Sequence, residues 1–341
     1  MALTAGDART VGDATAVGDG TAAGDATAAG DARTAAAATA AATPTAATAR
    51  RAAAGRKPAW LRVKVPDAAP FRATAGLLAE LALHTVCDSA RCPNRGECFA
   101  AGTATFLILG DACTRTCGFC AIGRSPALPA TVDAGEPRRV AAAARRLGLS
   151  HVVVTSVTRD DLSDGGAAQY AATVRGVREA LPAAGIEVLV PDFGGAPDAL
   201  TVVLAARPSV LNHNLETVPR LYGEVRSGAG YGRSLELLGA AARSKGAAGP
   251  ALVKTGLMLG LGESAGEVAA VLADCAAAGV DVVTVGQYLR PHDGCLPVAR
   301  YVPPDEFAAL VPLGERLGLR VVAGPLVRSS YHAAETFAAR A

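Results

Sequence analysis

Several features that are common in proteins are scarce in this sequence, and each absence excludes a class of protein. Aromatic residues make up 4% of the 341 positions while hydrophobic residues reach 50%, so Ala, Val and Leu must build most of the core. Basic residues barely outnumber acidic ones, 33 against 31, which argues against a dedicated nucleic-acid binder. No apolar run approaches the roughly 20 residues of a membrane-spanning helix. We therefore expect neither nucleic acid nor membrane as a partner.

Cysteine is also infrequent, but its distribution is uneven. Eight cysteines are too few for a disulfide scaffold, and six of them fall between positions 87 and 120. No secretory signal is apparent. This clustering indicates a metal site in a reducing compartment, and we expect the protein to be cytoplasmic.

The first 55 residues differ in composition from the rest of the chain. They are almost wholly Ala, Thr, Gly and Asp and contain the loose repeats VGDATA, VGDGTA, AGDATA and AGDART. Such a segment cannot bury enough apolar surface to offset the entropy lost on ordering, so we expect a disordered tail over residues 1–55. The recurring Asp residues argue against a mitochondrial transit peptide.

From residue 56 onward, short β-branched apolar runs alternate with Ala-, Leu- and Arg-rich stretches of helical character. The runs expected to form strands are 105–109, 151–157, 186–190, 209–212, 252–259, 281–286 and 320–322. The stretches expected to form helices include 136–147, 167–181, 234–245 and 265–278. This alternation predicts an α/β fold with a parallel sheet covered by helices. We expect a partial (β/α)6-type TIM barrel, with a doubly wound open sheet as the alternative.

Three cysteines follow the first of these strands directly, in the segment CTRTCGFC at 113–120. The spacing is C-x3-C-x2-C. Three thiolates on one short loop can hold three irons of a cubane cluster and leave the fourth iron open to a small molecule. A structural zinc site or three buried thiols are the alternatives, although structural zinc prefers four protein ligands.

A second triplet lies upstream, where Cys87, Cys92 and Cys98 have the spacing C-x4-C-x5-C. A zinc knuckle is the alternative here, but no fourth Cys or His follows at finger-like spacing. Cys275 and Cys295 belong to neither triplet, and we expect them to be packed or incidental thiols.

The downstream motif, with an aromatic residue before its last cysteine, resembles that of the radical S-adenosylmethionine enzymes. The two triplets in this order resemble the lipoyl synthase family specifically. The resemblance begins at Arg56 and is carried by segments at 87–99, 102–120, 152–167, 189–193, 212–222, 254–263, 286–291 and 322–333. These include CDSARCPNRGECF, VVVTSVTRDDLSDGGA, KTGLMLGLGE and VAGPLVRSSYHA.

This resemblance implies a sulfurtransferase that inserts sulfur at C6 and C8 of an octanoyl chain amide-linked to a carrier lysine. The implied cofactors are two [4Fe–4S] clusters and S-adenosylmethionine, with the upstream cluster as the sulfur donor. The implied ligands are Cys113, Cys117 and Cys120 for one cluster, and Cys87, Cys92, Cys98 and Ser330 for the other. Ser330 is chosen over Ser329 because it adjoins Tyr331; on residues alone, both serines would fit a helix N-cap.

The resemblance also implies partners. They are octanoylated lipoyl-carrier domains (the E2 subunits of 2-oxoacid dehydrogenases and the H protein of glycine cleavage), a reduced ferredoxin or flavodoxin-type electron donor, and a cluster-assembly carrier. Another radical S-adenosylmethionine enzyme with an auxiliary cluster, or a non-catalytic zinc- or cluster-binding module, remains the alternative.

Polar residues at or near the strand ends are candidates to contact S-adenosylmethionine or substrate, although each also fits an ordinary loop role. They are Thr155, Ser156, Asn214, Glu216, Arg226 and Lys254. The glycines at 260, 262 and 266 have the wrong spacing for a dinucleotide-binding motif. We expect a tail at 1–55, an N-terminal extension with the auxiliary cysteines at 56–101, a barrel at 102–324 and a C-terminal segment with RSSY at 325–341. The extensions should cover the barrel mouth.

Overall fold

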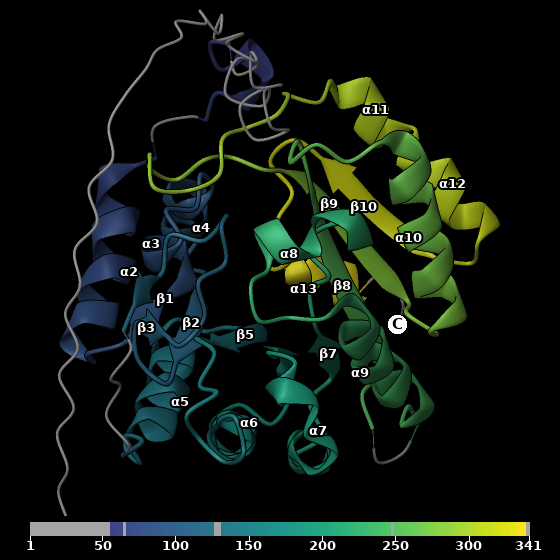
Figure 1. Ribbon diagram of the computed structural model, residues 1–341. Helices are drawn as coiled ribbons and strands as arrows, with labels where there is room; N and C mark the ends of the chain where they lie inside the picture. The colour runs from purple at the N-terminus through teal and green to yellow at the C-terminus, as the bar shows by residue number, and fades with distance from the viewer. Residues whose placement is uncertain (1–54, 64–65, 126–130, 247–248, 339–341) are drawn as a thin grey trace, which may run out of the picture. The chain divides into compact units, whose positions relative to one another are not determined.

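A mostly parallel sheet forms the centre of the protein in a computed structural model, which describes residues 55–63, 66–125, 131–246 and 249–338 (Figure 1). The tail expected over 1–55 therefore lies, apart from Gly55, outside the described residues. The chain divides into two units, and every described residue belongs to the second, Pro44–Ala341.

The strands of this sheet lie in the order in which they occur in the sequence. They are β1 (His84–Thr85), β2 (Thr105–Ile108), β5 (His151–Ser156), β6 (Gly185–Leu189), β7 (Val210–Asn212), β8 (Leu252–Leu259), β9 (Val282–Gln287) and β10 (Arg320–Gly324). Only β1 is antiparallel to its neighbour. A doubly wound sheet would reverse its strand order at a switch point. The unreversed order excludes that alternative and confirms the predicted partial barrel, which is not closed.

Helices connect successive parallel strands and cover the outer side of the sheet (Figure 1). They are α5 (Glu136–Arg146), α6 (Ala167–Ala180), α7 (Pro197–Ala205), α9 (Tyr231–Arg243), α10 (Ala265–Ala277), α11 (Pro304–Ala308) and α12 (Leu310–Arg316). The four predicted helical segments correspond to α5, α6, α9 and α10. Helix α7 is not among the predicted segments, because its sequence PDALTVVLA is short and rich in apolar residues and its periodicity resembles that of a buried strand.

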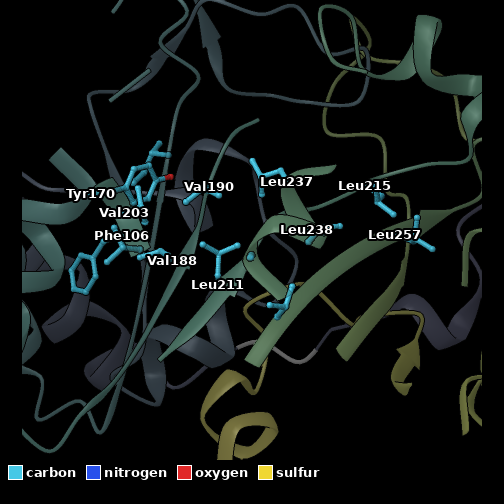
Figure 2. Packing of buried hydrophobic residues seen from close by; sticks show 14 of the residues in the cluster. Phe106, Tyr170, Val188, Val190, Val203, Leu211, Leu215, Leu237, Leu238 and Leu257 are labelled. Atoms are coloured by element: carbon cyan, nitrogen blue, oxygen red, sulfur yellow. The ribbon is translucent and has the colours of Figure 1, made fainter. Parts of the chain in front are cut away.

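The hydrophobic core lies between the outer face of the sheet and these helices. Phe106 of β2, Val188 of β6 and Leu211 of β7 are fully buried, and Tyr170 and Val203 come from α6 and α7. Figure 2 shows these side chains in the packed layer. Because large aromatic residues are few, Val and Leu fill most of the rest of the core, followed by Ala.

Shorter elements complete the described chain. Before the barrel come η1 (Ala59–Leu61), α2 (Ala68–Glu80), α3 (Val86–Ser89) and α4 (Arg95–Ala100); the loops contain β3 (Ala112–Cys113), β4 (Gly123–Arg124), η2 (Phe193–Gly195), η3 (Pro219–Leu221) and α8 (Tyr222–Val225). The last helix is α13 (Ala333–Ala338). The N-terminal elements attach to the barrel through β1, which pairs with β2 so that His84 lies opposite Leu107.

The chain after β10 turns into the concave side of the sheet. A Cβ at Gly256 of β8 would lie 2.6 Å from Ser329 Oγ, and one at Gly286 of β9 would overlap the Val327 carbonyl oxygen. Ser330 follows at the beginning of β2, where its Oγ accepts a hydrogen bond from Thr105 Oγ1 at 2.8 Å. The two strand glycines therefore make room for the C-terminal segment inside the barrel.

Helix α13 covers the end of the barrel at which the strands begin. The Phe337 ring lies 5.3 Å from the ring of His151, the first residue of β5. Arg320, the first residue of β10, donates from Nη1 to the Thr336 carbonyl at 2.8 Å. The loop with Cys113 lies beyond the opposite ends of the strands, since it follows β2.

Gly286→Ala is expected to destabilise the protein by about 1–3 kcal/mol, because the added methyl group overpacks against the C-terminal segment. Gly266→Ala in α10 is the matched control, since a Cβ there has no atom within 4 Å. The control should be neutral or stabilised by up to about 1 kcal/mol. Urea unfolding measures both. Equal stability of Gly286→Ala and wild type would contradict the placement of the segment inside the barrel.

Candidate functional site

A strained turn directs the chain from β2 into the cysteine loop. Leu109 has a φ of +68° and Gly110 one of +92°, and only the glycine adopts this region without strain. The Leu109 N–H donates to Glu136 Oε2 at 3.0 Å, and Gln169 Nε2 donates to the same oxygen at 2.9 Å. The buried Glu136 carboxylate therefore holds the turn that positions the loop.

Arg115 fixes the loop between the first two cysteines. Its guanidinium donates to both oxygens of Asp160 at 2.7 Å and to Asp192 Oδ1 at 2.6 Å. Burial opposes ionisation of Asp192, but Arg115 and Arg233 outweigh it and lower the pKa of that carboxyl to about 2. The carboxylates of Asp160 and Asp192, from two different loops, thus anchor one arginine of the cysteine loop.

The thiols of Cys113, Cys117 and Cys120 are half-buried and close enough to influence one another's ionisation. Cys113 Sγ accepts the backbone N–H groups of Arg115 at 3.4 Å and Thr158 at 3.3 Å. Burial raises the pKa of Cys120 to about 12. Backbone donors pointing at sulfur suit a thiolate that ligates a metal cluster.

Gly118 is required within this triplet. A Cβ there would lie 2.8 Å from the Glu224 carbonyl oxygen and 2.8 Å from Leu296 Cδ1. Its backbone N–H donates to Val225 at 2.9 Å, and its carbonyl accepts from the Leu296 N–H at 2.8 Å. The segment between Cys117 and Cys120 is thereby held from both sides.

The upstream cysteines line a cavity of about 250 Å³ together with the C-terminal segment. Its walls include Cys87, Cys92, Cys98, Ser330 and Arg328. Ser329 does not line it; its hydroxyl donates instead to Asn214 Oδ1 at 2.8 Å inside the barrel. The two adjacent serines therefore have different surroundings. Of the two, Ser330 lines the cavity of the three upstream cysteines, and Ser329 does not.

Two hydrogen bonds join the segment of the upstream cysteines to the C-terminal segment. Tyr331 Oη donates to Glu97 Oε1 at 3.0 Å, and Asn94 Nδ2 donates to the Leu326 carbonyl at 2.7 Å. Burial raises the pKa of Cys87 to about 11 and that of Cys98 to about 12. Both thiols need a strong electrophile such as iron to lose their protons near neutral pH.

Within the described residues, no three His, Cys, Asp or Glu side chains could hold a single metal ion. Zinc would need its sulfur ligands about 2.3 Å from one centre, hence very close together. A cubane cluster spreads its ligands over separate irons. Each cysteine triplet supplies the three thiols that a cubane cluster needs, and Ser330 adds an oxygen at the upstream cavity.

Of the predicted contacts for S-adenosylmethionine, Asn214, Glu216 and Arg226 lie together near Cys117. Asn214 Nδ2 donates to Glu216 Oε1 at 3.0 Å, and Arg226 Nη1 donates to the Asn214 carbonyl at 2.7 Å. The charges of Glu216 and Arg226 both act on the Cys117 thiol. Burial raises the pKa of Glu216, whose φ of +65° marks a strained backbone.

The other three predicted contacts do not belong to this group. Thr155 and Ser156 end β5, where their hydroxyls donate to the carbonyls of Leu189 at 2.9 Å and Val157 at 2.7 Å. Lys254 is 1% exposed, and its Nζ pairs with Glu187 Oε1 at 3.0 Å. Burial opposes ionisation of Glu187, but Lys254 and His151 lower the pKa of its carboxyl. Lys254 therefore has a structural role as one partner of a buried ion pair.

The sequence analysis did not include Arg328 among the site residues. Its guanidinium lines the upstream cavity and interacts with the charges of Cys92 and Glu216. Glu216 in turn acts on Cys117 and Cys120. Arg328 and Glu216 therefore lie between the two triplets. Arg328 is the first residue of the RSSY motif, but neither hydrophobic periodicity nor cysteine spacing indicated that it lies at the site.

Two further predictions concern residues outside the triplets. Glu263 accepts the N–H groups of Gly260 at 2.6 Å and Leu261 at 2.9 Å, so this glycine loop does not present them to a phosphate. Cys275 is fully buried in the core, as predicted for a packed thiol. Cys295 is also buried, and its thiol donates to the Cys120 carbonyl at 3.4 Å.

Comparison with known proteins agrees with this geometry. Residues 107–275 match the Radical SAM superfamily. The chain is 55% identical to a lipoyl synthase of Nitratidesulfovibrio vulgaris (strain DP4), covering 82% of this chain and 92% of that protein. It is 57% identical to a lipoyl synthase of Trichlorobacter lovleyi, covering 82% and 97%. The chain belongs to the lipoyl synthase family.

Membership of the lipoyl synthase family makes the protein a sulfurtransferase that uses S-adenosylmethionine and [4Fe–4S] clusters. A solved methylornithine synthase is similar at 16% identity, with a TM-score of 0.48 over 73% of this chain and 74% of that one.

None of the helices in the described ranges has the length and apolar content needed to cross a membrane.

Lys254→Met is expected to lower the free energy of unfolding by about 3–5 kcal/mol, because it leaves the Glu187 carboxylate buried without its ammonium partner. The double variant Lys254→Met/Glu187→Met should recover most of that loss. Urea unfolding and equilibrium binding of S-adenosylmethionine separate the two roles. Normal stability with lost cofactor binding would support the cofactor contact predicted from sequence instead.

Proposed function

We propose that this member of the lipoyl synthase family inserts two sulfur atoms at C6 and C8 of an octanoyl-lysine and so forms lipoyl-lysine, consuming two S-adenosylmethionine molecules. Both C–H bonds are unactivated, so no side chain of the site could deprotonate them. The protein's task is to bind, orient and exclude water around the reacting groups. The observation that carries this proposal is the shared cavity of Cys87, Cys92, Cys98 and Ser330.

In this proposal Cys113, Cys117 and Cys120 hold one cluster, and Cys87, Cys92, Cys98 and Ser330 hold the other. When bound, the first cluster supplies the electron that cleaves S-adenosylmethionine to methionine and a 5′-deoxyadenosyl radical, and the second supplies the inserted sulfur. Asn214, Glu216 and Arg226 are the proposed cofactor contacts, supported by their position beside Cys117. Thr155 and Ser156 are secondary candidates at the end of β5.

Ser330 is proposed as the weak ligand of the upstream cluster. Its oxygen is a harder donor than a thiolate and suits iron–sulfur chemistry less well, which favours release of one iron. The hydrogen bond from Thr105 Oγ1 orients the hydroxyl and leaves its own proton free to be lost on ligation.

The proposed partners are those that the resemblance to the lipoyl synthase family implies. The octanoyl chain arrives on lipoyl-carrier domains, those of 2-oxoacid dehydrogenase E2 subunits and of the glycine cleavage H protein. A reduced ferredoxin or flavodoxin supplies electrons, a cluster-assembly carrier restores the consumed cluster, and the reaction takes place in the cytoplasm. We assign residues 56–101 as the extension that holds the auxiliary cysteines, 102–324 as the barrel and 325–341 as the closing segment.

Replacing Cys113, Cys117 or Cys120 by Ala is expected to abolish 5′-deoxyadenosine formation, because each change removes a ligand of the cluster that binds S-adenosylmethionine. Replacing Cys87, Cys92 or Cys98 should leave 5′-deoxyadenosine formation measurable but eliminate lipoyl product. Mass spectrometry of an octanoylated carrier domain measures sulfur insertion. Lipoyl product from an upstream variant would refute the assignment of the sulfur donor, and a different product would favour another radical enzyme.

Ser330→Ala and Ser329→Ala form a matched pair on adjacent residues. Ser330→Ala is expected to make the upstream cluster labile, seen as faster iron loss to a chelator, and to reduce sulfur insertion strongly. Ser330→Cys should retain or tighten the cluster while impairing insertion, since thiolate binds iron better. Ser329→Ala should lose iron at the wild-type rate. The reverse ranking of the two alanine variants would assign the ligand to Ser329.

A further inference from the structure

The segment between Pro291 and Leu296 packs directly on the downstream cysteine loop. The Leu296 N–H donates to Gly118 at 2.8 Å, and the Cys295 thiol donates to the Cys120 carbonyl at 3.4 Å. Cys295 is buried, whereas His292, Asp293 and Gly294 beside it are exposed. Two hydrogen bonds therefore connect the protein surface at this segment to the backbone of the proposed cluster ligands.

Three arginines lie around the same segment: Arg290, which directly precedes it, and Arg91 and Arg124 from distant parts of the chain. Arg91 Nη1 donates to the Pro291 carbonyl at 3.2 Å, Arg290 Nε donates to the Cys295 carbonyl at 2.9 Å, and Arg124 Nη2 donates to the Cys117 carbonyl at 3.3 Å. All three arginines are exposed. Burial raises the pKa of the Cys295 thiol, while the charges of these three arginines act together to lower it.

The positive charge of this surface is only partly balanced. Arg290 pairs with the exposed Asp293 at 3.0 Å. Among the residues that the structure describes, Arg91 and Arg124 have backbone carbonyls as hydrogen-bond acceptors and no carboxylate at ion-pair distance. Exposed guanidinium groups held in place by backbone contacts are preorganised to meet carboxylates of a partner.

We propose that Arg91, Arg124 and Arg290, with the segment from Pro291 to Leu296, form the docking surface for an acidic one-electron carrier protein. This inference rests on the proposed function, because only a cluster at Cys113, Cys117 and Cys120 would need the electron. One electron leaves the reduced carrier for each S-adenosylmethionine consumed. The sulfonium C–S bond breaks. One of its electrons joins the added electron as a lone pair on the methionine sulfur, and the other remains unpaired on the deoxyadenosyl carbon.

An acidic electron carrier fits this surface better than the carrier domain of the substrate. Residues of this surface form hydrogen bonds with the backbone of Cys117, Gly118 and Cys120. The surface is therefore next to the downstream triplet, on the outside of the cysteine loop. The octanoyl chain must instead reach the space between the two triplets, where Arg328 and Glu216 lie. Docking of the substrate domain at the arginines is therefore the competing outcome of the experiment.

The test compares two reductants on the same variants. Single changes Arg91→Glu, Arg124→Glu and Arg290→Glu are compared with Arg175→Glu, an exposed arginine of α6 away from this surface. The reconstituted full chain is assayed for 5′-deoxyadenosine formation with reduced flavodoxin and, separately, with dithionite. Iron content is measured for every variant before assay.

With flavodoxin at low salt, each surface variant should lose about tenfold or more in the second-order rate, and its ionic-strength dependence should flatten. With dithionite, the same variants should match wild type, and Arg175→Glu should match it with both reductants. Full activity with flavodoxin would overturn the proposal. A raised KM for the octanoylated domain with unchanged flavodoxin rates would also overturn it and assign the surface to the substrate. Absence of 5′-deoxyadenosine from wild type with dithionite would instead refute the proposed function.

Discussion

The return of the C-terminal segment into the barrel is the constraint on which the upstream site depends. Gly256 and Gly286 have no side chains where the segment passes, so Val327, Arg328 and Ser329 occupy the concave side of the sheet. Ser330 is then held at the first residue of β2 by Thr105, facing the cavity of three cysteines that come more than two hundred positions earlier in the chain. Without this packing, the cavity would lose one wall.

The two cysteine triplets lie at different ends of the strands, and the interior of the barrel connects them. The downstream triplet follows the C-terminal end of β2, while the upstream triplet lies beside its beginning. Arg328 and Glu216 lie along this path, and both side chains are half-buried. Charged side chains in a protein interior are costly unless they are paired or solvated, so Arg328 and Glu216 mark the interior as a functional space and not an apolar core.

The sequence predicted the barrel well because each strand is a continuous apolar run followed by a helix with its own period. The same patterns could not locate α7, since nine mostly apolar residues have no distinguishing periodicity. Lys254 shows a second limit. Its position in a strand suggested a site residue, but its ammonium reaches past β7 to Glu187 of β6 and forms a buried ion pair. Ser330 was distinguished from Ser329 only by resemblance, because the contrast depends on long-range contacts with Thr105 and Asn214.

The most direct test of the account is the iron and acid-labile sulfide content of anaerobically reconstituted protein. Two cubane clusters predict about eight iron and eight sulfide per chain, and about four of each in a variant in which all three cysteines of either triplet are replaced by Ala. Zinc at one equivalent per triplet with no iron would contradict the account. So would retention of all eight irons when Cys87, Cys92 and Cys98 are replaced together.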